Sequence, residues 1–126
     1  MTHKPNRVLL VDDDRQTHLK LVRNLESDGY AVSSAEGGRQ ALDMLESESF
    51  DLIILDILMP EVDGFAVLSE VKANPALREI PVVMISAVDD AESMERCRQM
   101  GAVEYLVKPV SADDLRACVS GVLAAK

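Results

Sequence analysis

The sequence has few cysteines, and this excludes a fold that depends on a framework of disulfides. Its 126 residues include only Cys97 and Cys118, and both fall in stretches predicted as helices, without the spacing of a metal site. A chain of this length buries roughly two-thirds of its unfolded surface, so one core can hold it together. We therefore predict a single domain over residues 1–126, with residues 1–6 as a lead-in, and two reduced thiols in a cytoplasmic protein rather than a disulfide.

Long apolar runs and an excess of basic residues are also missing. No apolar run approaches the roughly 18 residues of a membrane helix, and no charged-then-apolar leader begins the chain. We therefore expect neither a membrane span nor secretion. The net charge is −9, from 13 basic and 22 acidic residues. Because so acidic a chain repels nucleic-acid phosphates, direct binding of DNA or RNA is not expected.

Five short apolar runs are predicted as β-strands. Three of them are wholly apolar, which is typical of strands that are buried on both faces of a parallel sheet. One is weaker and is predicted as an edge strand, and the last is short. In chain order the predicted strands are Val8–Val11, Ala31–Ala35, Leu52–Leu55, Val82–Ile85 and Tyr105–Val107.

Each predicted strand is followed by a stretch with helical periodicity. In the first stretch the buried stripe includes His18, Val22 and Leu25, and we interpret His18 as a core or boundary residue rather than a phosphodonor. Ser111 and Asp114 form a capping box at the start of the last stretch. The repeated strand–helix order predicts an α/β fold, with a five-stranded, doubly wound parallel sheet and five helices on its two faces.

Acidic side chains follow the first predicted strand, at the edge of the sheet where ligands bind in such folds. Residues 12–14 are all aspartates, and like charges brought together in a partly buried site repel one another strongly. A divalent cation removes this repulsion, and ligands that offer only oxygen suit Mg²⁺. The alternative is that these side chains cap the first helix, which is the role we expect of Asp14.

The other strand ends supply the remaining parts for phosphoryl transfer. Asp56 follows the third predicted strand, and a carboxylate there can attack phosphorus to form an acyl phosphate. Such a transfer requires positioning and charge stabilisation, for which Asp12 and Asp13 would hold a metal, Lys108 would supply a cation and Ser86 a hydroxyl donor. Neither G-x-G-x-x-G nor G-x-x-x-x-G-K-[ST] occurs, which excludes the usual nucleotide-binding loops.

Four segments of the chain are, in order, VLLVDDD, FDLIILDILMPEVDG, IPVVMISA and GAVEYLVKP. Together, in this order and at similar spacing, they resemble the receiver domains of response regulators in two-component signalling, including the chemotaxis regulators. The resemblance covers residues 7–123. It implies a flavodoxin-like sheet with the strand order 2-1-3-4-5.

The resemblance also implies the acceptor and the metal ligands. Asp56 corresponds to the phosphoacceptor. Asp13, Asp56 and the backbone carbonyl of Leu58 correspond to direct ligands of Mg²⁺, for which Mn²⁺ could substitute, and Asp12 corresponds to a ligand that acts through water.

Further positions match the switch of the receiver family. Lys108 corresponds to the partner of the phosphoryl oxygens, and the bond from Lys108 to Pro109 is expected to be cis. Ser86 occupies the position of the hydroxyl switch and Tyr105 that of the aromatic switch. Gly64, which ends the P-x-x-D-G segment, is expected to shape the turn into the third helix.

The resemblance implies a signalling switch rather than an enzyme, with no chemistry beyond its own phosphorylation and dephosphorylation. A sensor histidine kinase or a histidine phosphotransfer protein would supply the phosphoryl group. The face formed by the fourth helix, the fifth strand and the fifth helix would then act on an effector domain, a target protein or a second copy of the chain.

Two alternatives remain at the level of the sequence. A phosphatase of the haloacid dehalogenase class also uses a nucleophilic aspartate after a strand, but it needs a second acid two residues later, where this chain has Leu58. The other alternative is a pseudo-receiver that acts only as a docking module. The complete set of acids, hydroxyl and lysine argues against it.

Overall fold

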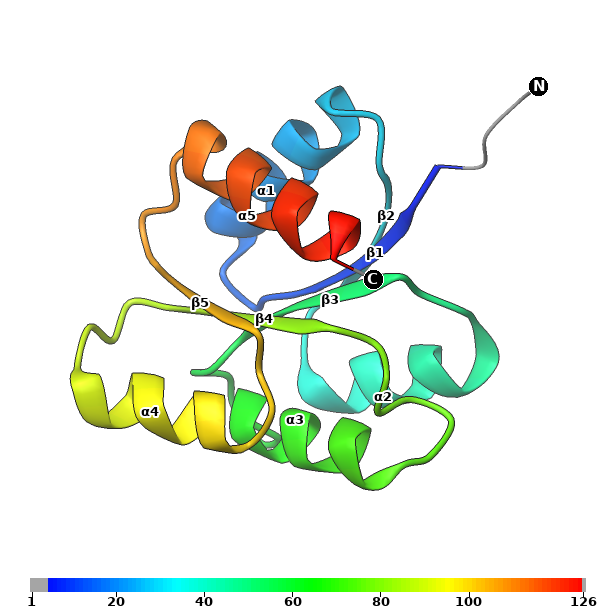
Figure 1. Ribbon diagram of the computed structural model, residues 1–126, viewed down its shortest axis with the longest axis vertical. Helices are drawn as coiled ribbons and strands as arrows, with labels where there is room; N and C mark the ends of the chain where they lie inside the picture. The colour runs from blue at the N-terminus through cyan, green and yellow to red at the C-terminus, as the bar shows by residue number, and fades with distance from the viewer. Residues whose placement is uncertain (1–4, 126) are drawn as a thin grey trace.

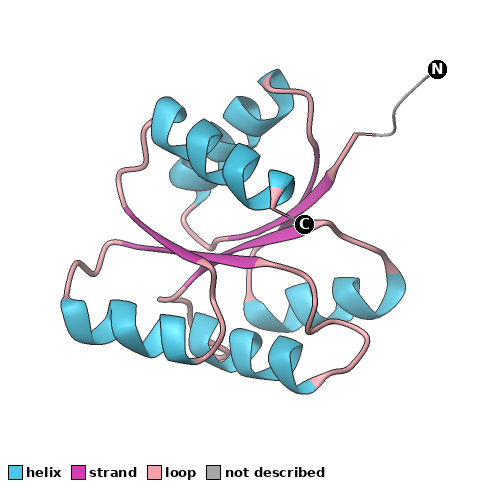
Figure 2. Ribbon diagram, viewed as in Figure 1, coloured by secondary structure: helices cyan, strands magenta, loops and turns pink. Residues whose placement is uncertain are grey.

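In the computed structural model, which describes residues 5–125, a central sheet lies between two layers of helices (Figure 1). Helices α1 and α5 cover one face of the sheet, and α2, α3 and α4 cover the other, as the colouring by secondary structure also shows (Figure 2). Of the expected lead-in, residues 1–4 lie outside the described part, while Pro5 and Asn6 are exposed and precede the first strand. The elements are β1 Arg7–Val11, α1 Arg15–Ser27, β2 Ala31–Ala35, α2 Gly38–Ser47, β3 Leu52–Asp56, α3 Gly64–Ala73, β4 Val82–Ser86, α4 Ala91–Gln99, β5 Glu104–Val107 and α5 Ala112–Ala124.

All strand pairs are parallel, and the strand order is β2-β1-β3-β4-β5, as the resemblance implies. The register places Val11 beside Leu55 and Ser86 beside Val107. Because these are residues at or next to the strand ends, the strands reach the same edge of the sheet. The residues that follow β1 and β5 are therefore brought together with the last residues of β3 and β4.

The alternation of side chains along the buried strands divides the core in two. In β3, for example, Leu52 and Ile54 pack under α1 and α5, whereas Ile53 and Leu55 pack under the other three helices. All four of these side chains are fully buried. Burial of a side chain of this size contributes roughly 1.5–3 kcal/mol before the loss of conformational entropy is subtracted, so the sheet forms a rigid support for its polar edge.

Most of the predicted elements are confirmed. Each predicted strand is found. β1 and β5 each begin one residue earlier than predicted, at Arg7 and Glu104. β3 and β4 each end one residue later, so that Asp56 and Ser86 are the last residues of strands instead of the residues after them. The cap of α5 is confirmed, because Ser111 Oγ accepts a hydrogen bond from the Asp114 N–H at 3.0 Å. Within residues 5–125, no helix is both long enough and apolar enough to cross a membrane.

Two further expectations concern single side chains. Cys97 and Cys118 are both free thiols, as predicted, and they belong to the cores on opposite faces of the sheet. The expected cap of α1 is confirmed in position but not in its bond. Asp14 occupies the N-cap position, but its carboxylate makes no capping hydrogen bond to the backbone and accepts one from the Thr17 hydroxyl at 2.8 Å.

Candidate functional site

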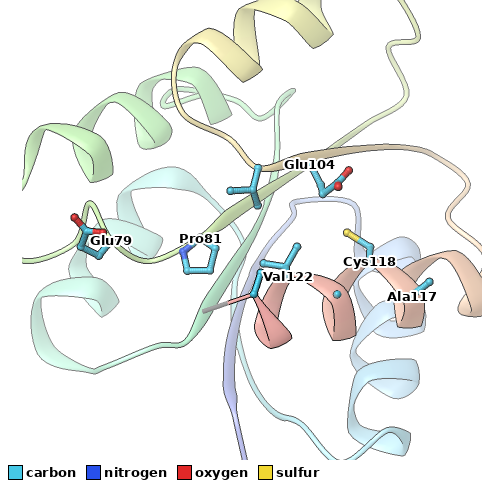
Figure 3. Close-up of a pocket in the computed structure, with 9 residues that line it drawn as sticks. Glu79, Pro81, Glu104, Ala117, Cys118 and Val122 are labelled. Carbon is cyan, nitrogen blue, oxygen red and sulfur yellow. The ribbon is translucent and has the colours of Figure 1, made fainter.

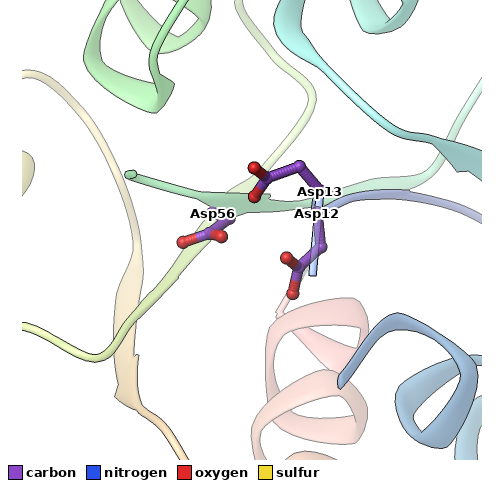
Figure 4. Close-up of side chains that lie close together, drawn as sticks. All are labelled: Asp12, Asp13 and Asp56. Atoms are coloured by element: carbon purple, nitrogen blue, oxygen red, sulfur yellow. The ribbon is translucent and has the colours of Figure 1, made fainter. Parts of the chain in front are cut away.

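Three carboxylates meet at the carboxyl edge of the sheet (Figure 4). Asp12 and Asp13 follow β1, Asp56 ends β3, and one ligand oxygen from each lies within 4.8 Å of the other two. Asp12 and Asp56 are buried, whereas Asp13 is exposed. The cluster thus has a buried base and a side that opens to solvent.

The amino group of Lys108 lies between two of these carboxylates. Its Nζ is 3.1 Å from Asp56 Oδ2, to which it donates a hydrogen bond, and 3.1 Å from Asp12 Oδ2. The Lys108 N–H donates to the Ser86 carbonyl at 2.8 Å, which fixes this residue at the end of β4. Burial acts to lower the pKa of Lys108, but its contacts with Asp12 and Asp56 outweigh burial and raise that pKa. The lysine therefore remains a cation.

The carboxyl group of Asp56 is strongly perturbed. Burial, followed by repulsion from the Asp12 carboxylate, raises the pKa of Asp56 to about 6, and the attraction of Lys108 only partly opposes this. A single ammonium group therefore does not compensate the negative charge at this edge.

The donor set of this edge fits a hard divalent cation. Asp12 Oδ2 is buried and accepts no hydrogen bond, although Lys108 Nζ lies 3.1 Å away. A buried carboxylate oxygen that accepts no hydrogen bond is one that a metal or its bound water would satisfy. The backbone N–H of Leu58 approaches Asp56 Oδ1 at 3.4 Å, and the proposed role of the Leu58 carbonyl as a ligand stays a prediction.

The two expected switch residues share one partner that the sequence did not indicate. Ser86 is fully buried, and its Oγ accepts a hydrogen bond from the Val88 N–H at 3.0 Å. The hydroxyl of half-buried Tyr105 donates to the Val88 carbonyl at 2.7 Å. The backbone of Val88 therefore links the end of β4 to a side chain of β5. Because backbone groups are the same in every residue, the side chain at position 88 gives no signal of this link.

The turn between β3 and α3 explains why the acceptor segment ends in a glycine, Gly64. A Cβ atom at Gly64 would lie 2.3 Å from the carbonyl oxygen of Asp56, so only glycine allows the chain to pass so close to the site. Asp63 caps α3 by accepting a hydrogen bond from the Ala66 N–H at 2.9 Å. The bond between Lys108 and Pro109 is cis, as the resemblance implies.

Comparisons with known proteins agree with this arrangement. The family model of the response regulator receiver domain matches residues 8–120. The transcriptional regulatory protein ZraR of Escherichia coli (strain K12) is 41% identical over 125 residues, which cover 98% of this chain but 28% of that protein. The two-component response regulator ORR11 of Oryza sativa subsp. indica is 37% identical over 120 residues, or 94% of this chain and 82% of its own length. The chain thus spans less than a third of ZraR.

Solved structures show the same fold. The chemotaxis protein CheY4 of Vibrio cholerae superposes with a TM-score of 0.90 at 29% identity, covering 94% of this chain and 99% of that chain. A CheY-like receiver domain protein from Methanospirillum hungatei JF-1 superposes with a TM-score of 0.89 at 28% identity, covering 97% and 96%. Receiver domains are signalling switches rather than classical enzymes, and they bind Mg²⁺ at an acidic pocket. The chain belongs to the receiver domain family of two-component response regulators, whose general function is phosphorylation on an aspartate.

Proposed function

We propose that Asp56 is the phosphoacceptor of this receiver domain. The observation that carries the proposal is the setting of its carboxylate, which is buried at the end of β3, lies 3.1 Å from Lys108 Nζ and is grouped with Asp12 and Asp13. Among residues 5–125, Asp12 is the other buried aspartate in contact with Lys108, but it follows β1 instead of ending a strand, and its Oδ1 accepts a hydrogen bond from the Asp14 N–H.

The reaction that this setting supports is an in-line transfer from a phosphohistidine. An Asp56 carboxylate oxygen attacks phosphorus and forms a new O–P bond, while the N–P bond of the donor breaks and its electron pair stays on the imidazole nitrogen. Lys108 leaves the carboxylate of Asp56 and pairs with a phosphoryl oxygen, and the hydroxyl of Ser86 donates to another. A cation held by Asp12, Asp13 and Asp56 would supply further positive charge for the phosphoryl oxygens.

We place the donor and the output on different surfaces of the domain. Receiver domains partner with histidine kinases and effector domains, and a sensor histidine kinase or a histidine phosphotransfer protein is the donor proposed here. The proposed output face is formed by α4, β5 and α5. A cavity of about 580 Å³ between β5 and α5 supports part of this face; its walls include Glu104 and Val122 but no residue of α4 (Figure 3). An effector domain, a target protein or a second copy of the chain could cover this face, and a cytoplasmic location is part of the same proposal.

Intact-mass spectrometry tests the acceptor directly. With Mg²⁺ and acetyl phosphate, the native chain should gain the mass of one phosphoryl group. Asp56→Asn should gain nothing, because a neutral amide is a poor nucleophile toward phosphorus and gives the cation no charge. An equal gain in Asp56→Asn would refute the assignment.

The neighbouring acids provide matched controls for the same measurement. Asp13→Ala should lose phosphorylation together with Mg²⁺ binding, because Asp13 belongs to the carboxylate cluster. Asp14→Ala should keep both, because the Asp14 carboxylate accepts a hydrogen bond from Thr17 and does not belong to the carboxylate cluster. If Asp14 proved to be the essential acid, the ligand set would be displaced by one residue.

A further inference from the structure

One buried polar side chain plays no part in the proposed reaction. Among residues 5–125, the buried polar or charged side chains are those of Asp12, His18, Asp56 and Ser86. Three of these belong to the proposed site, and the fourth, His18, lies in α1 with 8% of its surface exposed. Because a buried polar group costs free energy unless it is hydrogen-bonded, the partner of His18 indicates what the residue does.

That partner is the backbone at the start of the acidic cluster. His18 Nδ1 lies 3.1 Å from the carbonyl oxygen of Asp12, in a buried contact. A carbonyl oxygen only accepts hydrogen bonds, so this contact requires the proton to be on Nδ1. Side chains of a helix lean toward its N-terminus. His18 lies in the first turn of α1, so its side chain can reach back to the Asp12 carbonyl, directly after β1.

The carbonyl that His18 holds belongs to the peptide unit between Asp12 and Asp13. A peptide unit is planar, so a bond that fixes its oxygen also fixes the plane from which Asp13 projects. On the other side, the Asp12 N–H donates to the Ala35 carbonyl at 3.1 Å. The backbone of Asp12 is therefore held at both its nitrogen and its oxygen.

The side chain of Asp12 is also held, but a hydrogen bond reaches only one of its two oxygens. Its Oδ1 accepts a hydrogen bond from the Asp14 N–H at 2.8 Å, while Oδ2 accepts none and faces Lys108. Together with the bond from His18, these contacts leave one oxygen of Asp12 directed into the carboxylate cluster (Figure 4). The carboxylates repel one another, so without such restraints they would turn apart and the cluster would have to be reassembled when a cation binds.

We propose that His18 is a positioning residue for the cation site, because its Nδ1–H holds the peptide unit that joins Asp12 to Asp13. This role rests on the proposed function, in which these acids bind the cation. His18 itself contacts neither the cation nor the phosphoryl group. Hydrogen bonds behind the ligands of a metal commonly change its affinity by tenfold or more, and the bond from His18 occupies such a position.

A water molecule is the alternative hydrogen-bond donor to the Asp12 carbonyl. His18 lines a cavity of about 430 Å³ together with Asp12, Asp13 and Arg15, so water could reach the Asp12 carbonyl if the ring were removed. A water molecule would satisfy the carbonyl, but it would not fix its direction, because it is not anchored to α1. The affinity for the cation therefore separates positioning from simple solvation.

The test compares two substitutions of similar shape. His18→Asn places an amide donor where Nδ1 stands, whereas His18→Leu has the same branched outline without a donor. Isothermal titration with Mg²⁺ alone should show a dissociation constant about tenfold higher in His18→Leu and within about threefold of native in His18→Asn. Leu21→Ala, which removes a fully buried side chain from the same helix, controls for general loss of stability and should bind Mg²⁺ as the native chain does.

Each outcome of the titration decides one point. Equal affinity in His18→Leu and the native chain, or equal loss in His18→Leu and His18→Asn, would overturn the positioning role and leave the cation site intact. Loss of affinity in Leu21→Ala as large as in His18→Leu would also overturn it. Failure of the native chain to bind Mg²⁺ would instead refute the cation site of the proposed function, and the positioning role with it.

A measurement on the native chain keeps the proposal open to refutation even if a variant does not fold. Nitrogen-15 NMR of the imidazole at neutral pH should show the proton of His18 on Nδ1, with a coupling across the hydrogen bond to the Asp12 carbonyl. A neutral ring with its proton on Nε2 could not donate to that carbonyl and would contradict the inference.

Discussion

The carboxylate of Asp56 opposes folding at neutral pH. Its folded pKa of about 6 lies above the ordinary value of 3.8, because burial and Asp12 disfavour the charge. The folded chain therefore binds more protons than the unfolded chain between about pH 4 and 6, and the free energy of unfolding falls as the pH rises through this window. Above about pH 6, the charged carboxylate of Asp56 lowers the free energy of unfolding by its full amount.

Asp56→Asn should remove this cost. In the presence of EDTA at pH 7, the free energy of unfolding should rise by roughly 1–3 kcal/mol relative to the native chain, and the gain should shrink toward pH 4, where the carboxylate is neutral. Urea unfolding at both pH values measures the difference. A variant that is less stable than the native chain at pH 7 would mean that the bond from Lys108 outweighs burial.

A residue with a strained backbone lies in the loop between β3 and α3. Glu61 has a φ of 66°, in the left-handed region that a residue with a Cβ atom rarely adopts. Glu61→Gly should raise the free energy of unfolding by about 0.5–1 kcal/mol, since the relief of strain exceeds the entropy that glycine adds to the unfolded chain. Glu61→Ala keeps the Cβ and should bring no such gain. Equal urea midpoints for Glu61→Gly and Glu61→Ala would contradict this explanation.

Single residues also show where prediction from the sequence succeeds and where it fails. The residue types at strand ends predicted the group of acids, hydroxyl and lysine, because charged side chains after apolar strands have few other roles. The hydrogen bonds made by Asp14 and Val88 were not predicted. Asp14 has the right type for a cap but another partner, and Val88 acts through its backbone, whose direction depends on the folded loop.

At the scale of elements, β4 and β5 are coupled through the loop between β4 and α4. Ser86 Oγ and the Tyr105 hydroxyl bind opposite sides of the same residue, Val88. If Ser86 turns toward a phosphoryl oxygen on Asp56, its bond to Val88 weakens, and the space beside β4 changes. We therefore expect Tyr105 to move farther inward on phosphorylation, as a shift between two packings of the same elements.

Ser86→Ala separates the chemistry from this movement. The variant should still be phosphorylated, because Asp56 and Lys108 remain, but its Tyr105 should respond little. Carbon-13 NMR of labelled tyrosines, with and without beryllofluoride, reports the change, and Tyr30, in the core on the other face of the sheet, serves as an internal reference. Identical Tyr105 signals in both states of the native chain would exclude the mechanism.

The elements themselves were predictable because their periodicity is strong. Strands buried on both faces leave continuous apolar runs, and their limits were missed only where a polar residue still pairs within the sheet, as Asp56 and Ser86 do. The close approach of Gly64 to the Asp56 carbonyl was not predictable, because it depends on how α3 packs against the sheet. A glycine in the sequence indicates freedom of the backbone, but not which neighbour requires it.

For the whole molecule, the strand–helix order predicts a parallel sheet, but several strand orders satisfy it. The order 2-1-3-4-5 came from the resemblance of four segments to receiver domains and is confirmed. Periodicity alone leaves the strand order open, because it shows which residues of a helix are buried but not which face of the sheet the helix covers. That face follows from long-range contacts. The functional residues could be inferred from the sequence because this topology brings the carboxyl ends of all the strands to one edge of the sheet.

The duration of the signal is a property of the phosphorylated molecule as a whole. An acyl phosphate on Asp56 is lost by in-line attack of water, and the rate depends on groups that position this water. By resemblance to receiver domains, the relevant side chains are two residues after the acceptor and two after the switch hydroxyl, here Leu58 and Val88. Leu58 is 58% exposed and apolar. Val88 is partly buried and also apolar, so neither side chain can orient a water or accept its proton.

Slow loss of phosphate is therefore the expected behaviour of the native chain. Leu58→Asn and Val88→Glu each introduce a group that can orient a water or accept its proton, and each should shorten the lifetime of the phosphorylated state by about tenfold or more. Val103→Asn changes an exposed apolar residue that precedes β5 and should leave the lifetime unchanged. Intact-mass spectrometry after removal of the phosphodonor follows the decay. If the native chain loses phosphate as fast as both variants, water access to Asp56 does not depend on these two side chains, and the lifetime must be set by Lys108 and the cation instead.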